Sequence, residues 1–254
     1  MNAPRKRLQY LTWSSFLIDT GREIIMIDPF LTGDSELGIP AATEGVVSPL
    51  PAADFVVVSH TANDHFGEAV EILRASGGTL CCGVDSAIVA IDLGFPEERI
   101  AVLVPGSGLS GAGWSVKALE ARHISIRRVG DSFVTGTPLS FLFDIGGVRI
   151  FHGGDTALSP DLAFYGDLYQ PQIALLGVDG VVRNGRTIVE LSPPEAALAA
   201  QMLQASIAIP MHYRPSSGMA EAFLDELVSE GRSCRGLRLG FGEWLDLSTA
   251  LSES

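Results

Sequence analysis

Histidine is the residue type whose placement in this chain is most informative about chemistry. The sequence contains five histidines, and most of them follow a short apolar run typical of a β-strand: His60, His65, His123, His152 and His212. Neutral imidazole is the commonest protein ligand for zinc and related metals. Because histidines used for packing would not fall so consistently at the ends of strands, the pattern predicts that they build one metal site.

Two aspartates share this kind of position. Asp64 lies beside His65 in the turn after Phe55–Val58, and Asp155 follows the apolar run Val148–Phe151. Loops at the carboxyl ends of buried strands form the usual ligand-binding crevice of α/β folds, so we expect these side chains to converge with the histidines. Imidazole and carboxylate together suit zinc, manganese or iron more than calcium or magnesium.

Each of these residues also has a plainer interpretation. A single His123 or His212 is more often a hydrogen-bonded structural histidine than a ligand. Asp155 follows two glycines and could simply form a turn or cap a helix, and the pair Asp64 and His65 could open a helix at the surface. The joint pattern outweighs these readings, because packing gives no reason for all of them to end strands in this order.

The elements that position these residues follow from the apolar periodicity. Alternation predicts an N-terminal β-hairpin with strands over 8–18 and 23–27. The all-apolar run Phe55–Val58 predicts a strand buried on both faces. Further strands are expected near residue 80 and over 100–104, 114–121, 139–143, 148–151, 173–176 and 207–209, with helices over 67–75, 86–93, 193–203 and 219–230 and two terminal strands. This alternation indicates an α/β (α+β) layered architecture.

Composition bounds the class of protein. No linker divides the chain, so we expect 1–254 to form one domain, with the Gly/Pro-rich stretch 28–51 as a rim or lid. The net charge of −13 opposes nucleic acid as a partner. The uncharged stretch Ala196–Tyr213 contains Pro210 and predicts a helix followed by a strand, not a membrane span. Three cysteines without metal-type spacing are expected to be reduced thiols of a cytoplasmic protein. The sequence does not decide between a monomer and a homo-oligomer.

These motifs together resemble a known family. The chain resembles the metallo-β-lactamase superfamily, whose signature is H-x-H-x-D-H after a strand, then a downstream histidine, a Gly-Asp turn and a final histidine after a strand. The segment His60–His65 follows the first part of this signature except at Ala62. More narrowly, four segments resemble the branch of metal-dependent hydrolases related to the bacterial ascorbate-6-phosphate lactonase: Ile27–Gly33, Phe151–Thr156, Leu191–Ala197 and Ile209–Tyr213. The resemblance implies a four-layer αβ/βα sandwich with the metal site at one edge, between the two sheets.

The resemblance also implies a role for each candidate residue. His60 and His123 would serve a first metal position, with Asp155 bridging to a second. Asp64, His65 and His212 would serve that second position. Asp64 and His152 are also expected to act in catalysis, His152 from behind the ligands or against the substrate. The metal would lower the pKa of a bound water to about 7 and supply a hydroxide nucleophile.

Ala62 departs from the family pattern, because it stands where the first position expects a histidine. Three outcomes follow: one metal held by the second position, a weakened pair of metals with water or His152 filling the gap, or a degenerate site. We favour one divalent ion, zinc or manganese, because the second position keeps four ligands: Asp64, His65, Asp155 and His212.

The substrate is less determined by the sequence. Arg128, near His123, and Arg214, just after His212, could hold a small anion through their guanidinium groups, and Arg183 and Arg186 are weaker candidates. We therefore expect a metal-dependent hydrolase of a small molecule, including an anionic one, with a lactone, amide or cyclic ester as the bond cleaved. The alternatives are a phosphodiesterase-type hydrolase and a non-catalytic binding protein whose metal site degenerated with Ala62.

Overall fold

The computed structural model describes residues 5–42, 52–183, 186–229 and 233–251, and the side chains of 181–189 lie outside the description. Alternate residues of the apolar strand β4 (Phe55–Val58) face opposite sides, so Val57 enters one core while Val56 and Val58 enter another. This strand is central in a seven-stranded sheet of order β18-β1-β2-β3-β4-β5-β6. Its other strands are β1 (Arg7–Thr12), β2 (Ser15–Asp19), β3 (Ile24–Ile27), β5 (Thr79–Cys82), β6 (Ile100–Val102) and β18 (Trp244–Asp246).

A second seven-stranded sheet packs against the first, in the order β17-β16-β13-β12-β11-β8-β7. Its strands are β7 (Gly108–Gly111), β8 (Trp114–Glu120), β11 (Leu139–Ile145), β12 (Val148–His152), β13 (Ile173–Gly177), β16 (Ile207–Met211) and β17 (Arg235–Gly236). β12, β13 and β16 are parallel, and β11 is antiparallel to both β8 and β12. The carboxyl ends of β8, β12, β13 and β16 therefore meet at one edge of this sheet.

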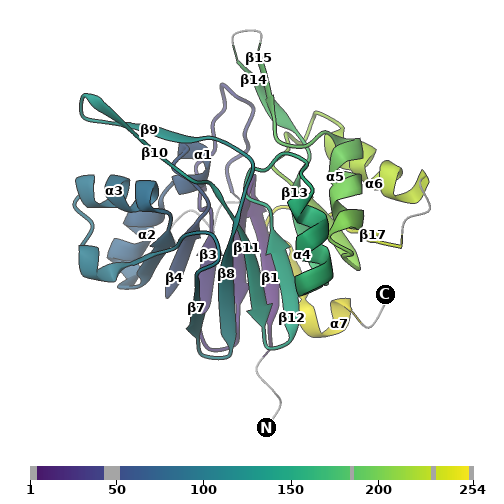
Figure 1. Ribbon diagram of the computed structural model, residues 1–254, viewed down its shortest axis with the longest axis horizontal. Helices are drawn as coiled ribbons and strands as arrows, with labels where there is room; N and C mark the ends of the chain where they lie inside the picture. Colours follow the sequence, from purple (N-terminus) through teal and green to yellow (C-terminus); the bar gives the residue numbers. More distant parts are fainter. Residues whose placement is uncertain (1–4, 43–51, 184–185, 230–232, 252–254) are drawn as a thin grey trace.

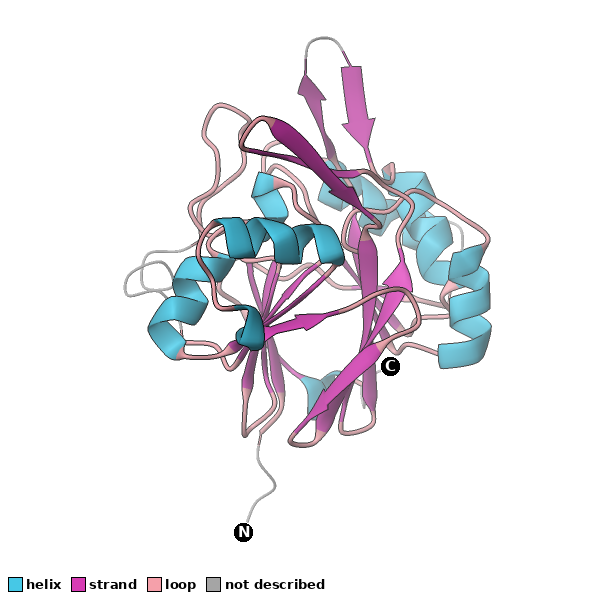
Figure 2. Ribbon diagram, turned by 60° about the vertical axis from the view of Figure 1, so that its left-hand side comes forward, coloured by secondary structure: helices cyan, strands magenta, loops and turns pink. Residues whose placement is uncertain are grey.

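Helices cover the outer face of each sheet (Figures 1 and 2). On the first sheet lie α2 (Ala69–Ser76) and α3 (Val84–Asp92), preceded by the single turn α1 (Asn63–Phe66); on the second lie α4 (Asp161–Tyr169), α5 (Pro193–Met202) and α6 (Met219–Ser229), and α7 (Leu247–Ala250) follows β18. The order helix, sheet, sheet, helix confirms the predicted α/β sandwich with four layers.

The expected strand over 8–18 is wrong in one respect, because the chain turns at Trp13 and Ser14 and divides it into β1 and β2. Trp13 takes φ 48°, a conformation that a bulky side chain rarely adopts, so its sequence carried no turn signal. The short elements α1, η1 (Glu97–Arg99), β7 and α7, and the helix α4, were not expected from periodicity. Neither were two hairpins, which are β9 (Ser125–Val129) with β10 (Ser132–Gly136) and β14 (Gly180–Arg183) with β15 (Arg186–Val189).

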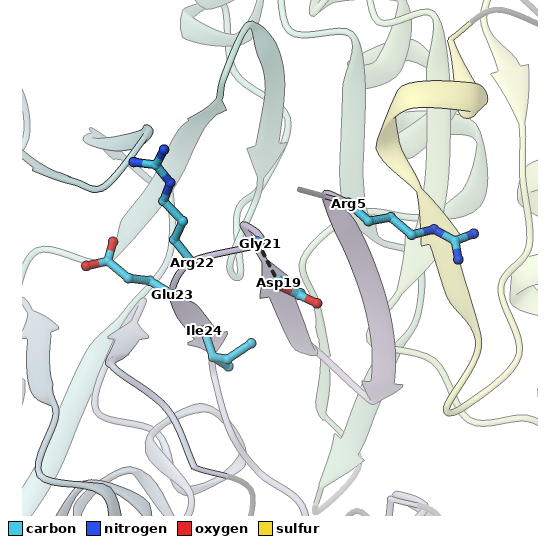
Figure 3. A pocket seen from close by; sticks show the side chains of 6 residues that line it. All are labelled: Arg5, Asp19, Gly21, Arg22, Glu23 and Ile24. Carbon is cyan, nitrogen blue, oxygen red and sulfur yellow. Dashed lines mark hydrogen bonds between the residues drawn. The ribbon is translucent and has the colours of Figure 1, made fainter. Parts of the chain in front are cut away.

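One end of the molecule holds a pocket that none of the candidate metal ligands lines. It lies at the turn between β2 and β3, where the Gly21 amide donates to Asp19 (2.8 Å), and its volume is about 420 Å³ (Figure 3). The turn precedes β3, which runs parallel to β4, so this pocket lies at the edge opposite to the histidines that follow β4. Among the described residues, no helix is long and apolar enough to cross a membrane.

Candidate metal centre

The candidate ligands all follow strands that end at the same edge of the sandwich. His60 follows β4, and Asp64 and His65 lie in the first turn of α1 directly after it. His123 follows β8, Asp155 follows β12 and His212 follows β16: three parallel strands of the second sheet bring them to the same edge. The predicted convergence at the carboxyl ends of strands is therefore what the structure shows.

Asp155 lies at the centre of the cluster and divides it into two groups. Its Oδ2 faces the first group, at 3.8 Å from His60 Nε2 and 3.7 Å from His123 Nε2. Its Oδ1 faces the second group, at 3.1 Å from His65 Nε2 and 3.4 Å from His212 Nε2. One carboxylate thus presents one oxygen to each group of histidines.

The second group is the richer in donors. Asp64 Oδ2 lies 3.6 Å from His212 Nε2 and 3.9 Å from His65 Nε2, so two imidazoles and two carboxylates surround one point. Four donors about 2.0–2.2 Å from one ion lie roughly 3.4 Å apart in a tetrahedral site. The observed separations match that spacing closely enough to hold an ion without large rearrangement.

Several of these donor atoms are buried without a hydrogen-bond partner among the described residues. They are His60 Nε2, His65 Nε2, both ring nitrogens of His212, Asp155 Oδ1 and Glu190 Oε2. Buried polar atoms are normally satisfied, and each exception costs free energy. A divalent cation accepts such lone pairs, so the donor set fits a metal ion.

The ligands sit in a strongly perturbed electrostatic environment. Burial alone would lower the pKa of the His65 imidazole, but the carboxylates of Asp155 and Asp28 outweigh it and raise this pKa well above its usual range. For His212 the same competition between burial and the carboxylates of Asp155 and Glu190 raises the pKa to about 9. His60 is dominated by burial, with repulsion from His65, and its pKa falls to about 3. The second group thus attracts positive charge more strongly than the first.

The cluster forms the floor of a pocket of about 470 Å³. Apolar side chains make much of its wall, and two further carboxylates stand in the loop that follows β3. The apolar lining is Phe30, Leu37, Ile39, Ala62, Ile124 and Ile126, and the two carboxylates are Asp34 and Glu36. This loop, within the described part up to residue 42, forms a rim as expected; 43–51 lie outside the described residues.

Comparisons with known proteins agree on one family. A model of the β-lactamase superfamily domain matches residues 7–212, which span all the candidate ligands. The chain belongs to the metallo-β-lactamase superfamily. It is 32% identical to a UPF0173 metal-dependent hydrolase of Methanopyrus kandleri over 208 residues (82% of this chain, 84% of the relative) and 35% identical to one of Listeria innocua over 202 residues (79% and 82%).

Solved structures of other proteins have the same fold as this chain. The metallo hydrolase Igni18 of Ignicoccus hospitalis superposes with a TM-score of 0.76 at 24% identity, covering 94% of this chain and 97% of that one. The predicted superfamily and its sandwich fold are confirmed, and the chain is a member of a family of metal-dependent hydrolases. The narrower lactonase branch stays a prediction, as do the individual ligand roles.

Three residues that sequence reasoning did not place in the superfamily site contact the ligands there. The Trp13 indole Nε1 donates to Asp64 Oδ2 (3.1 Å), and the Trp13 carbonyl accepts from the His212 amide (2.8 Å). Asp28 Oδ2 lies 2.8 Å from His65 Nδ1, and the Ser59 amide and hydroxyl both donate to the same carboxylate. The third residue is Glu190, whose Oε2 lies 3.5 Å from His212 Nδ1.

Backbone strain marks the same place. Among the described residues other than glycine, five have positive φ, and three of these are Trp13 (48°), Asp28 (43°) and His212 (52°). Such conformations cost about 1–3 kcal/mol each and persist where the surrounding structure holds them. A signal was available for Asp28, because it lies in a family motif, but none marked Trp13.

His152 does not reach the pocket. It is fully buried, its Nε2 lies 3.0 Å from the Ser14 carbonyl and its Nδ1 accepts from the Gly154 amide (3.1 Å). Both nitrogens are therefore occupied by backbone, which corrects the expectation of a substrate contact or of a replacement ligand. The ring instead fixes the turn that carries Asp155, which is the other role expected for it.

The two arginines expected to hold an anion also lie elsewhere. Arg128 is exposed on the β9–β10 hairpin, where its Nε donates to the Gly130 carbonyl. Arg214 forms a bidentate pair with Asp179, at 3.0 and 2.9 Å, so its charge is already neutralised. Neither lines the pocket, and its described lining contains no lysine or arginine; the side chains of 181–189, including both weaker arginine candidates, lie outside the described residues.

Proposed function

We propose that this member of the metal-dependent hydrolases cleaves a lactone, amide or cyclic ester in a small, partly apolar and uncharged or cationic molecule. The convergence of unpartnered imidazole and carboxylate donors on the floor of a pocket carries the proposal. One zinc or manganese ion, held by Asp64, His65, His212 and Asp155, is the cofactor proposed. When bound there, it supplies a Lewis acid and an activated water at neutral pH.

The chain's own residues account for the rest of the reaction. Trp13 holds the Asp64 carboxylate through its indole N–H, and Asp28 holds His65 through Nδ1, so both donors are oriented before a substrate arrives. The exposed side chains of Ile124 and Ile126 in the pocket wall bind an apolar substituent of the substrate, which covers them from water.

The charge of the pocket argues for the substrate class. Asp34 and Glu36 add negative charge at the rim, and no guanidinium in the described lining opposes it. Both carboxylates would repel an anionic substituent or the charge of a phosphodiester, and a bound cation would offset only part of that repulsion. This ranks lactones, amides and cyclic esters above the phosphodiesterase alternative, and it revises the anionic substrate that the arginines had suggested.

Metal content and a matched substrate panel test the proposal. Protein purified under metal-replete conditions is expected to retain one ion per chain, and chelation should abolish hydrolysis that zinc or manganese then restores. Protein that binds no metal would sink the hydrolase, and bound metal without turnover across the panel would favour a non-catalytic binding protein.

Pairs of lactones that differ only in a distal carboxylate test the charge argument. The uncharged member of each pair is expected to have the higher kcat/KM, and Glu36→Lys should narrow the difference because it reverses one rim charge. Glu98→Lys, on the exposed surface away from this pocket, is the matched control and should leave the ratio unchanged. A wild-type preference for the anionic member would contradict the assignment.

A further inference from the structure

Glu190 is a buried carboxylate that none of the family motifs includes. It lies between β15 and the Ser192 cap of α5, its side chain is 3% exposed and its Oε2 has no hydrogen-bond partner among the described residues. His212 Nδ1 lies 3.5 Å from this oxygen. Burial and the charge of Asp155 raise the pKa of this carboxyl to about 8, so its charged form needs a donor or a cation beside it.

His65, the other histidine of the second group, also faces a carboxylate with each ring nitrogen. Its Nδ1 contact with Asp28, at 2.8 Å, is a hydrogen bond, whereas Glu190 and His212 lie 3.5 Å apart without one. Asp28 lies against His65 Nδ1, while His65 Nε2 faces Asp155. His212 likewise turns Nδ1 to Glu190 and Nε2 to Asp155. In the first group, by contrast, His60 Nδ1 meets the neutral Ser59 hydroxyl at 3.0 Å.

We propose that Glu190 is a positioning residue of the metal site: its carboxylate accepts the Nδ1–H of His212 and so holds the Nε2 lone pair toward the ion. This rests on the proposed metal-dependent function. Histidine ligands commonly donate their second ring nitrogen to a carboxylate, which fixes the tautomer and raises the donor strength of the ligating nitrogen. With Asp28 acting on His65, both imidazoles of the second group are strengthened, and the single ion binds there in preference to the first group.

Metal titration of three variants tests this role. Glu190→Ala removes the acceptor and should weaken zinc and manganese binding by about 10–100-fold, the usual effect of losing such a partner. Glu190→Gln keeps an acceptor oxygen and should recover part of that loss. Glu36→Gln removes a negative charge from the same pocket without touching a histidine, so it measures the effect of charge alone, and the loss in Glu190→Ala should exceed the loss in this variant.

A cobalt(II) spectrum separates positioning from direct ligation. If Glu190 acts through His212, wild type and Glu190→Gln should give the same visible bands and intensities, since the coordination number is unchanged. Altered bands would make Glu190 a ligand and overturn the proposal, as would unaltered affinity in Glu190→Ala. A wild-type chain that binds no metal would instead overturn the proposed function itself, so the two failures are distinguishable. Thermal unfolding of the metal-free variants checks that each is folded.

Discussion

Ala62→His tests why one metal position is favoured over two. Ala62 precedes α1, is partly exposed and lines the pocket, so a larger side chain at this place extends into the cavity of about 470 Å³ instead of into the core. An imidazole there would join His60, His123 and Asp155, which already lie within 4.8 Å of one another. The first group would then hold three imidazoles and a carboxylate oxygen, a complete tetrahedral set.

The expected effect is large enough to measure in two ways. Metal stoichiometry should rise from one to two ions per chain. With free metal about 100-fold above the dissociation constant of the new position, the added binding stabilises the folded state by about 2.7 kcal/mol. For a chain of this length, each kcal/mol shifts the Tm by roughly 2–4 °C, so the metal-dependent rise in Tm should grow by roughly 5–11 °C.

Elemental analysis of dialysed protein and thermal unfolding with and without metal provide the readouts. Ala62→Phe is the matched control, because it places a ring in the same space without a donor atom and should bind one ion like the wild type. A folded Ala62→His protein that still binds one ion, with the wild-type rise in Tm, would show that Ala62 is not what weakens the first group.

Three further predictions concern the candidate ligands and the contacts behind them. His212→Ala should abolish metal binding while His60→Ala lowers it modestly; equal losses in a chelator competition would contradict a single ion in the second group. Trp13→Phe removes the indole N–H that donates to Asp64 and should weaken metal affinity. If the variant binds metal as tightly as the wild type, this hydrogen bond does not orient the ligand. The urea midpoint of the metal-free protein should peak near pH 6.5. Below pH 6.5 the unfolded chain protonates His60, whereas the folded protein, in which the pKa of this residue is about 3, does not, so stability falls with the pH. Above pH 6.5 the folded protein keeps His212 protonated, and this stabilisation is lost as the pH rises through its folded-state pKa of about 9. A midpoint that does not vary across this range would refute the linkage.

The fold was largely predictable because its strands are short apolar runs with clear boundaries. Phe55–Val58 and Ile173–Gly177 are buried on almost every residue, and such runs leave little choice but a central strand between two layers. The β9–β10 hairpin was missed because its residues are mostly exposed and carry no apolar face that periodicity could detect. Apolar periodicity therefore predicted the buried strands and could not predict the solvent-exposed hairpin.

The candidate ligands were predictable for a different reason. They lie at the ends of strands, and strand direction alone brings such ends to one edge. The contacts behind the ligands were not predictable. Trp13 reaches Asp64 because the chain makes an unexpected turn at Trp13, and Glu190 and His212 come from two segments whose proximity no local sequence pattern indicates. The arginines failed as predictions for the same reason: proximity in sequence to a ligand does not fix where a long side chain finds its partner, and Arg214 finds Asp179.

The unequal support behind the two groups explains how the chain can lack a ligand at Ala62. Asp28 lies behind His65, Glu190 lies behind His212, and Trp13 donates to Asp64. Each donor that belongs to the second group alone therefore has a contact on the side away from the ion. In the part of the chain that the structure describes, the contact behind the first group is the Ser59 hydroxyl at His60 Nδ1. Loss of one imidazole from the less supported group removes little of the attraction for a cation, because the Asp155 carboxylate is shared by both groups and Asp28, Asp64 and Glu190 all lie beside the second.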